Sequence, residues 1–290
     1  MGLPVSYDDL RCGGAYILGL RRHEWRRSYA AEKLAAAGWR GLIAAEGVDG
    51  HERPADLEAV STAEFPGLRW AGHLSAGHRG CSLGHMRLWK YVVDASLQWA
   101  VIFEDDVLPH PRLAELGPIW WAETVQFERA SGLGLDMVLL GNQMNDAWIG
   151  SVQNKVVQTP AYCLHAYVLT QSGARKLMTK IEQLTYSGAP MPMNDILVYR
   201  MLAGGELHYC CWNRGPTERG VPVFSLEMPL SYVKEHDVAI WHRDTGLFYQ
   251  NGRGGSTLHD FKPSYMFGTS DAVGDEEIRA YLRAQGETVD

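Results

Sequence analysis

Short apolar runs alternate with helical patterns along much of the chain. Residues 15–20 (AYILGL) predict a strand, 23–38 are rich in the helix formers Ala, Glu, Lys and Leu, and 41–50 predict a second strand. Strand, helix and strand in this order indicate a β-α-β unit, whose two strands lie parallel in one sheet.

The alternation continues to residue 205. Further strands are predicted at 99–103, 135–141 and 161–170. Further helices are predicted at 81–98, 110–130, 171–184 and 194–205. We expect Pro118 to interrupt the second of these helices and Asn194 to cap the last. The pattern is that of an α/β domain.

The last fifty residues differ from the rest. Residues 249–270 are rich in glycine, serine and aromatic residues and have no clear period. Exposed aromatic side chains on an irregular segment are costly unless they meet a partner surface, so we expect this segment to close over a cleft. We divide the chain into a domain over 1–235 and an irregular extension over 236–290 that packs on the same domain.

Composition and charge narrow the classes of protein. Of 290 residues, 46% are hydrophobic and 21% charged, as in globular domains with a sizeable core. The net charge of −7 argues against a broad nucleic-acid surface without excluding a local basic patch. No run reaches the ~18 apolar residues of a membrane span, and no secretory leader is recognisable. The five cysteines form no CxxC pair, which favours reduced thiols. We expect a cytoplasmic protein, with a peripheral position at the inner membrane as the alternative.

Three consecutive carboxylates follow one apolar strand in VIFEDDVLP (101–109): Glu104, Asp105 and Asp106. A solvated loop is the simpler interpretation of such a triplet. Ligands of open α/β sheets bind beyond the carboxyl ends of the strands, however, and a divalent cation there would relieve the repulsion. Glu104 and Asp106 share a side of an extended tip. Two carboxylates two residues apart in this position can share one divalent cation.

The segment around the triplet resembles a known family. GCSLGHMRLWKYVVDASLQWAVIFEDDVLP (80–109) is similar to the pattern of glycosyltransferase family 25, which joins Gly-Cys-x-Leu-Ser-His, a helix with an aromatic residue, an apolar strand and Glu-Asp-Asp. Shorter similarities follow in family order: AYILGLRRHEWRR, AAEGVDG, DMVLLG, AYVLTQSGARKLM and MPMNDIL. The chain departs from the pattern at Gly19, where the family has Asn, and at Gly84, where it has Ser.

The resemblance implies a GT-A-type, Rossmann-like fold with a mixed, mostly parallel sheet flanked by helices. It implies an inverting transferase that moves a hexose from UDP-galactose or UDP-glucose to an acceptor hydroxyl, with Mn²⁺ or Mg²⁺ on a DxD-type motif. The first expected acceptor is a surface glycan such as lipooligosaccharide. A hydroxylated protein side chain, a hydroxymethylated DNA base and a catalytically silent glycan-binding relative stay open as alternatives. The oligomeric state is not predicted.

The matched positions imply further site residues. Asp195 is the candidate base for the acceptor hydroxyl, with helix capping as the equal alternative. The donor-binding candidates occupy matched motif positions: Leu20, Arg26, Asp49, His85, Glu104 and Asp105. A hydrogen-bonded core role is the alternative for His85. The metal candidates are Asp106, Glu104 and His236, and for His236 a surface position is the alternative. Asp106 is the expected direct ligand with Glu104 beside it, and Asp105 is expected to turn away and anchor the loop.

Overall fold

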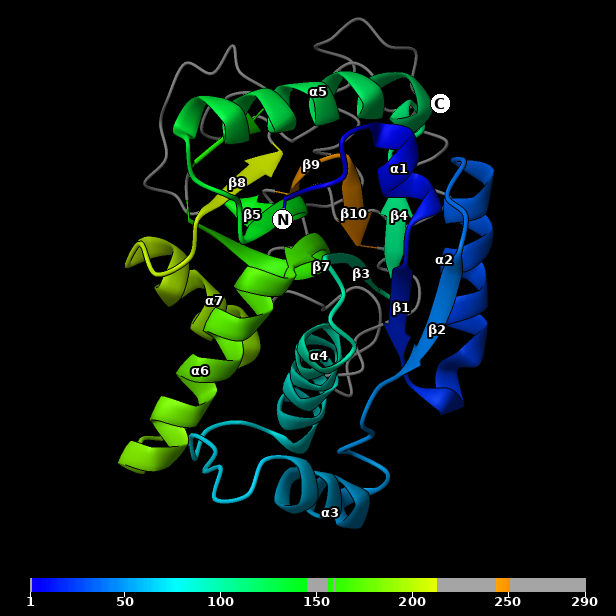
Figure 1. The fold of residues 1–290 in the computed structure, drawn as a ribbon. Coiled ribbons are helices and arrows are strands. Elements are labelled where there is room, and N and C mark those ends of the chain that lie inside the picture. Colours follow the sequence, from blue (N-terminus) through cyan, green and yellow to red (C-terminus); the bar gives the residue numbers. More distant parts are fainter. Residues whose placement is uncertain (1, 145–155, 159, 213–243, 251–290) are drawn as a thin grey trace, which may run out of the picture.

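The structure, a computed structural model, describes residues 2–144, 156–158, 160–212 and 244–250 (Figure 1). Within these ranges a central sheet lies between two layers of helices. The strands in these ranges are β1 (Ala15–Gly19), β2 (Leu42–Glu46), β3 (Trp99–Glu104), β4 (Val107–Pro109), β5 (Met137–Met144), β6 (Val156–Val157), β7 (Ala161–Thr170), β8 (Tyr209–Trp212), β9 (Asp244–Gly246) and β10 (Phe248–Gln250). The helices are α1 (Tyr7–Cys12), the short 3₁₀ helix η1 (Arg21–His23), α2 (Glu24–Ala36), α3 (Pro54–Glu64), α4 (Ala76–Asp94), α5 (Leu113–Ser131), α6 (Gln171–Ser187) and α7 (Asn194–Ala203).

The central sheet is mixed. Its strand order is β2-β1-β3-β7-β5-β8-β6, and β9 pairs with β5. β1 pairs in parallel with β2 and β3, and β5 in parallel with β8, whereas β7, β6 and β9 run antiparallel to their neighbours. β4 and β10 form a separate antiparallel pair. The predicted β-α-β opening and the α/β class are both confirmed.

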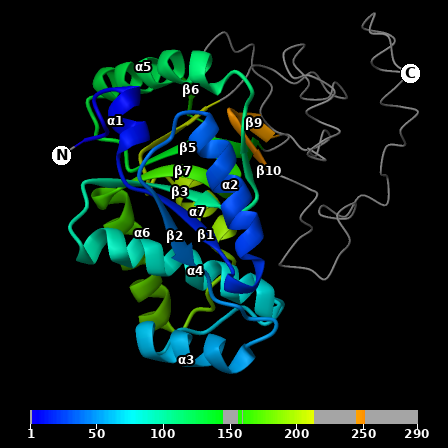
Figure 2. The ribbon, with the colours of Figure 1, turned by 90° about the vertical axis from the view of Figure 1, so that its right-hand side faces the viewer.

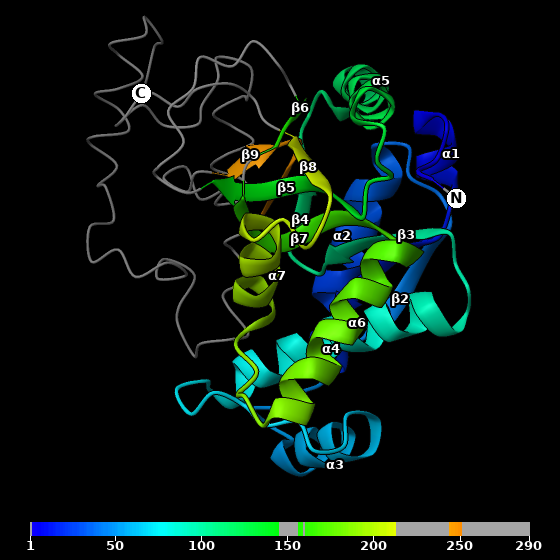
Figure 3. The ribbon, with the colours of Figure 1, turned by 60° about the vertical axis from the view of Figure 1, so that its left-hand side comes forward.

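The two faces of the sheet are covered by different helices. Side chains alternate along each strand, so Tyr16 and Leu18 of β1 pack in one core, with residues of α3, α4, α6 and α7, whereas Ile17 packs in the other, with residues of α1, α2 and α5. Figures 2 and 3 show the same layers from the side, with α5 and α1 on one side of the sheet and α4, α6 and α3 on the other. None of the helices in the described ranges is long and apolar enough to cross a membrane.

Two local predictions were wrong. Pro118 lies inside a continuous α5, because the buried Trp120 and Trp121 hold the helix on the core and offset the backbone hydrogen bond that proline removes. Asn194 begins α7 without capping it: its backbone N–H donates to Ser82 Oγ at 3.1 Å, and the N-cap residue, Met193, has no side-chain cap hydrogen bond. Asn194 instead ties α7 to α4.

Part of the span expected to be irregular has regular structure. Residues 244–250 form β9 and β10, and Tyr249 is a buried residue of β10 opposite Leu108 of β4. The remainder of the predicted closing segment, 251–270, lies outside the described residues, and the division of the chain at residue 235 stays a prediction.

Candidate active site

A pocket of about 250 Å³ opens at the carboxyl ends of β1, β2 and β3. Its walls are residues 18–20, 47–51 and 104–106, the first turns of α4 and α7, and the beginning of β7. This is the edge at which open α/β sheets bind ligands. The site candidates that fall in the described ranges all line it: Leu20, Arg26, Asp49, His85, Glu104, Asp105, Asp106 and Asp195.

Helix α4 approaches the loop after β2 so closely that two contacts require glycine. A Cβ at Gly80 would lie 2.3 Å from the carbonyl oxygen of Val48, and a Cβ at Gly50 would lie 2.0 Å from that of Ala76. The first turns of α4 thereby form one wall of the pocket. Residues four apart on a helix share a face, and Cys81 and His85 both line the pocket from α4.

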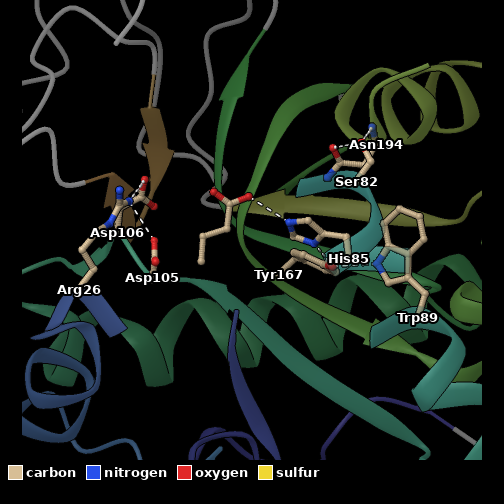
Figure 4. Close-up of polar contacts among 9 residues, drawn as sticks. Arg26, Ser82, His85, Trp89, Asp105, Asp106, Tyr167 and Asn194 are labelled. Atoms are coloured by element: carbon tan, nitrogen blue, oxygen red, sulfur yellow. Dashed lines mark hydrogen bonds and ion pairs between the residues drawn. The ribbon is translucent and has the colours of Figure 1, made fainter. Parts of the chain in front are cut away.

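Asp105 and Asp106 share one buried arginine. Nη2 of Arg26 lies 2.9 Å from Asp105 Oδ1 and 3.1 Å from Asp106 Oδ2, and Figure 4 shows the guanidinium beside both carboxylates. Burial raises the pKa of Asp105 to about 7, although the charge of Arg26 acts in the opposite direction. The other oxygen of Asp106, Oδ1, is buried and has no hydrogen-bond partner among the described residues. Such an oxygen is an open position for a cation.

The structure differs from the expectation that Asp105 turns away. The chain makes a turn at 105–106 between β3 and β4, so the alternation of an extended tip does not hold there, and Asp105 lines the pocket with Asp106. Gly19 gives it room, because a Cβ at Gly19 would lie 2.7 Å from Asp105 Oδ2. The glycine that replaces the family's Asn therefore makes space for the Asp105 carboxylate.

His85 connects Glu104 to the buried core. Its Nε2 lies 3.0 Å from Glu104 Oε1, and its Nδ1 lies 2.9 Å from the Tyr167 hydroxyl. Trp89 Nε1 donates to the same hydroxyl at 2.8 Å. Burial lowers the pKa of His85 to about 4, so the imidazole is neutral. Because Trp89 can only donate, Tyr167 can give its proton to Nδ1, which assigns the ring proton to Nε2 and directs it at Glu104. His85 thus fills its core role and orients a carboxylate of the pocket.

Glu104 and Asp195 hold protons more tightly than ordinary carboxyl groups. Burial raises the pKa of Glu104 to about 7, with a further contribution from the charge of Asp106. Burial also raises the pKa of Asp195 to about 6, with a further contribution from Glu104. Asp195 lies in the first turn of α7, one residue after Asn194. A carboxylate with a pKa near 6 is ionised at neutral pH and basic enough to accept a proton.

Two of the donor-binding candidates also have structural partners. Asp49 Oδ1 accepts hydrogen bonds from the backbone N–H groups of His51 and Glu52, and its Oδ2 lies 2.8 Å from Arg22 Nε. The backbone of Leu20 hydrogen-bonds to Asp105. Both residues therefore shape the wall of the pocket, whatever else they contact.

Gln250 and Cys81 line the pocket without having been site candidates, and one candidate cannot be placed. Gln250 of β10 lines the pocket, and its Oε1 is buried with no hydrogen-bond partner among the described residues. No local pattern reveals it, because β10 pairs Gln250 with Val107, far away in the sequence. Cys81 was detectable from its spacing of four residues from His85. His236 lies outside the described residues.

Comparison with known proteins agrees with the resemblance. The family model for glycosyltransferase family 25 (LPS biosynthesis protein) matches residues 14–129. The chain is 29% identical over 248 residues to the probable inactive glycosyltransferase 25 family member 3 of Bos taurus, and 25% identical over 192 residues to procollagen galactosyltransferase 1 of Danio rerio. These alignments cover 80% and 61% of this chain, but 34% and 30% of the two relatives. The chain thus spans about a third of the length of the curated relatives it matches.

Among solved structures, the chain is similar to a crystal structure of an active-site mutant of LgtC. The TM-score is 0.37 at 11% identity, over 68% of this chain and 72% of that chain. A likeness at this level carries no statement about the site. The family-model match, the curated relatives and the ordered motifs around Glu104 together support the assignment of this chain to glycosyltransferase family 25.

Proposed function

We propose that the chain is a metal-dependent, inverting glycosyltransferase that moves a hexose from a UDP-sugar to an acceptor hydroxyl. The observation that carries the proposal is the open carboxylate oxygen of Asp106, which is buried at the end of β3 and has no hydrogen-bond partner among the described residues. A hard cation bound through few carboxylates keeps positions for phosphate oxygens. Galactose is the first candidate among hexoses, because relatives of the chain are named procollagen galactosyltransferases.

The chemistry of the pocket fits a hard divalent cation such as Mn²⁺ or Mg²⁺. Asp106 Oδ1 and Gln250 Oε1 are both buried oxygens without a partner in the described ranges, and both residues line the pocket. Carboxylate and amide oxygens are the ligands that these cations prefer. We propose Asp106 and Gln250 as ligands, with Glu104 beside them and His236 remaining a prediction. A bound cation would supply positive charge for the leaving diphosphate.

The chain's own side chains supply the other roles. Asp195 would accept the proton of the acceptor hydroxyl as the hydroxyl attacks the sugar. Arg26 compensates the charges of Asp105 and Asp106, so that the acidic turn can be buried before any cation binds. His85 holds the carboxylate of Glu104 in place at 3.0 Å.

The acceptor is proposed only as a class. The description of the family model refers to LPS biosynthesis, and relatives are named for procollagen. Both point to a hydroxyl on a large molecule, either a glycan or a protein side chain. We place the surface glycan first, as the sequence analysis does, and the hydroxylated protein side chain second.

A second candidate function is binding of a sugar nucleotide without transfer. The observation in its favour is that relatives at 29% identity are named inactive. The acidic triplet Glu104, Asp105 and Asp106 nonetheless lines one pocket together with Asp195, which favours activity.

Hydrolysis of a panel of UDP-sugars separates the two candidates. We expect sugar release from one preferred donor in Mn²⁺, with loss of release in EDTA and in Asp106→Asn. Asp94→Asn, at an exposed acid on α4, is the matched control and should keep full activity. UDP binding without turnover of any donor would support the second candidate. Full activity in EDTA would contradict the role of the metal.

A further inference from the structure

Cys81, His85 and Glu104 form a second group of candidate ligand atoms in the same pocket. The Cys81 sulfur, a ring nitrogen of His85 and a carboxylate oxygen of Glu104 all lie within 4.8 Å of one another. Cys81 and His85 are four residues apart on α4, and Glu104 ends β3. The proposed function gives no role to the sulfur.

The imidazole of His85 is oriented as a metal ligand requires. Its Nδ1 contacts the Tyr167 hydroxyl at 2.9 Å, and that hydroxyl accepts a hydrogen bond from Trp89 Nε1 at 2.8 Å. Metal-binding histidines almost always donate their other ring N–H to a fixed acceptor. Without a metal the ring proton lies on Nε2 and points at Glu104, 3.0 Å away. On metal binding the neutral ring changes tautomer: the Tyr167 hydroxyl turns to accept from Nδ1–H, and Nε2 becomes free to bind the metal.

The chemical types of the three ligands favour one class of metal ion. One thiolate, one imidazole and one carboxylate are typical ligands of Zn²⁺, whereas Mg²⁺ prefers oxygen alone. A divalent ion is neutralised by one thiolate and one carboxylate, so the occupied site would carry no net charge in a buried position. Ligand atoms bonded to one tetrahedral ion at about 2.0–2.3 Å lie roughly 3.3–3.8 Å apart. The three atoms, now within 4.8 Å of one another, would therefore shift on binding.

We propose that Cys81, His85 and Glu104 form a binding site for a thiophilic divalent cation of the Zn²⁺ class, separate from the oxygen ligands at Asp106 and Gln250. On binding, the thiol proton of Cys81 leaves to solvent and the sulfur coordinates the metal. When this site is occupied, Glu104 coordinates its metal and is no longer beside the hard cation at Asp106 and Gln250. Its existence does not depend on transfer activity, because the resting protein would bind the metal.

Cobalt titration of the reduced, metal-free full chain tests the site. We expect Co²⁺ to produce a near-ultraviolet thiolate-to-cobalt absorption band at one equivalent, and Zn²⁺ to abolish it. Cys81→Ser should lose the band. Cys163→Ser, at the other cysteine that lines the pocket, is the matched control and should keep it. Tyr167→Phe should keep the band but weaken binding about 10–100-fold, as loss of an outer partner does.

Several results would overturn the proposal. They are the absence of a band in the wild type, a band that survives in Cys81→Ser, and equal loss of the band in both cysteine variants. Alkylation of the wild-type protein gives a readout that does not depend on the folding of a variant. Zn²⁺, but not Mg²⁺, should slow alkylation of Cys81 and leave the exposed Cys12 unaffected. Equal rates at Cys81 with and without Zn²⁺ would contradict the site.

Discussion

The two ends of the acidic triplet are stabilised by different means. Asp105 and Asp106 lie against the guanidinium of Arg26, whereas Glu104 lies against the neutral imidazole of His85 (Figure 4). Arginine keeps its charge at any working pH, so the first end has a fixed counter-charge. At the second end Glu104 has a hydrogen bond to a neutral ring in place of a contacting counter-charge, and the charges of His165 and Arg26 act on it without an ion pair in the described residues.

This difference shows where the pocket can gain positive charge. One guanidinium faces two carboxylates, and Glu104 and Asp195 are left near a histidine that carries no charge. Burial, with a further contribution from the neighbouring carboxylates, raises the pKa values of both groups. A proton or a cation that enters the pocket therefore relieves more repulsion than it would at an exposed acidic loop. Variants at the two ends of the triplet should therefore have different effects.

The largest effect is expected at Asp195. If this carboxylate accepts the proton of the acceptor, Asp195→Asn should lower kcat by ~10²–10⁴-fold. Affinity for UDP should change little, because the substitution preserves shape and leaves the Arg26 end intact. Steady-state transfer kinetics and UDP titration measure the two quantities. Normal turnover in this variant would remove Asp195 from the mechanism.

Arg26→Met should cost about 3–5 kcal/mol of unfolding free energy in EDTA, because it leaves two buried carboxylates without their counter-charge. Urea denaturation at pH 7.5 measures the loss. Arg22→Met is the control: Arg22 pairs with Asp49 and the exposed Glu52, so its loss should cost about 1 kcal/mol or less. Similar losses of unfolding free energy in the two variants would contradict this expectation. The charge of Arg26 would then contribute no more to stability than that of an ion pair at the surface.

Tyr167→Phe tests the neutral end. It removes the hydroxyl between Trp89 and His85 and leaves buried polar groups unpaired, which should cost about 1–3 kcal/mol. Tyr162→Phe, at a tyrosine stacked on Tyr199, should stay within about 0.5 kcal/mol of the wild type. A neutral result at Tyr167 would mean that His85 does not need this partner.

A smaller effect is expected on the pH dependence of stability. The pKa values of Glu104 and Asp105, raised to about 7 in the fold, mean that the folded state binds protons more tightly than the unfolded state. Their contribution to stability therefore falls as pH rises from the unfolded pKa values towards 7. His85, with its pKa lowered to about 4, acts in the opposite direction below its ordinary value of 6.5 and offsets part of the fall.

Urea denaturation in EDTA at pH 5 and pH 7.5 checks this sign. The wild type should lose more stability between these two values than Glu104→Gln, which removes one titrating group. An equal or larger loss in Glu104→Gln would contradict the raised pKa of Glu104.

The sequence predicts the helices and strands better than it predicts the arrangement of side chains inside the pocket. Period and residue type locate β1, β3, β7 and most large helices, and the family pattern locates the residues that line the pocket. The direction of the Asp105 side chain depends on a turn and on the space beside Gly19. The alternation of side chains along a strand predicts neither of these features. Gln250 reaches the pocket because β10 pairs with β4, and this pairing joins distant parts of the chain. Contacts of this kind are fixed by tertiary packing rather than by local preference.

Binding of UDP with and without Mn²⁺ tests the central claim most directly. Isothermal titration of the wild type should show that Mn²⁺ tightens UDP binding by about tenfold or more, which corresponds to about 1.4 kcal/mol. In Asp106→Asn the same addition should change the affinity little, while binding without metal stays as in the wild type. An equal effect of Mn²⁺ on both proteins would contradict the placement of the cation at Asp106.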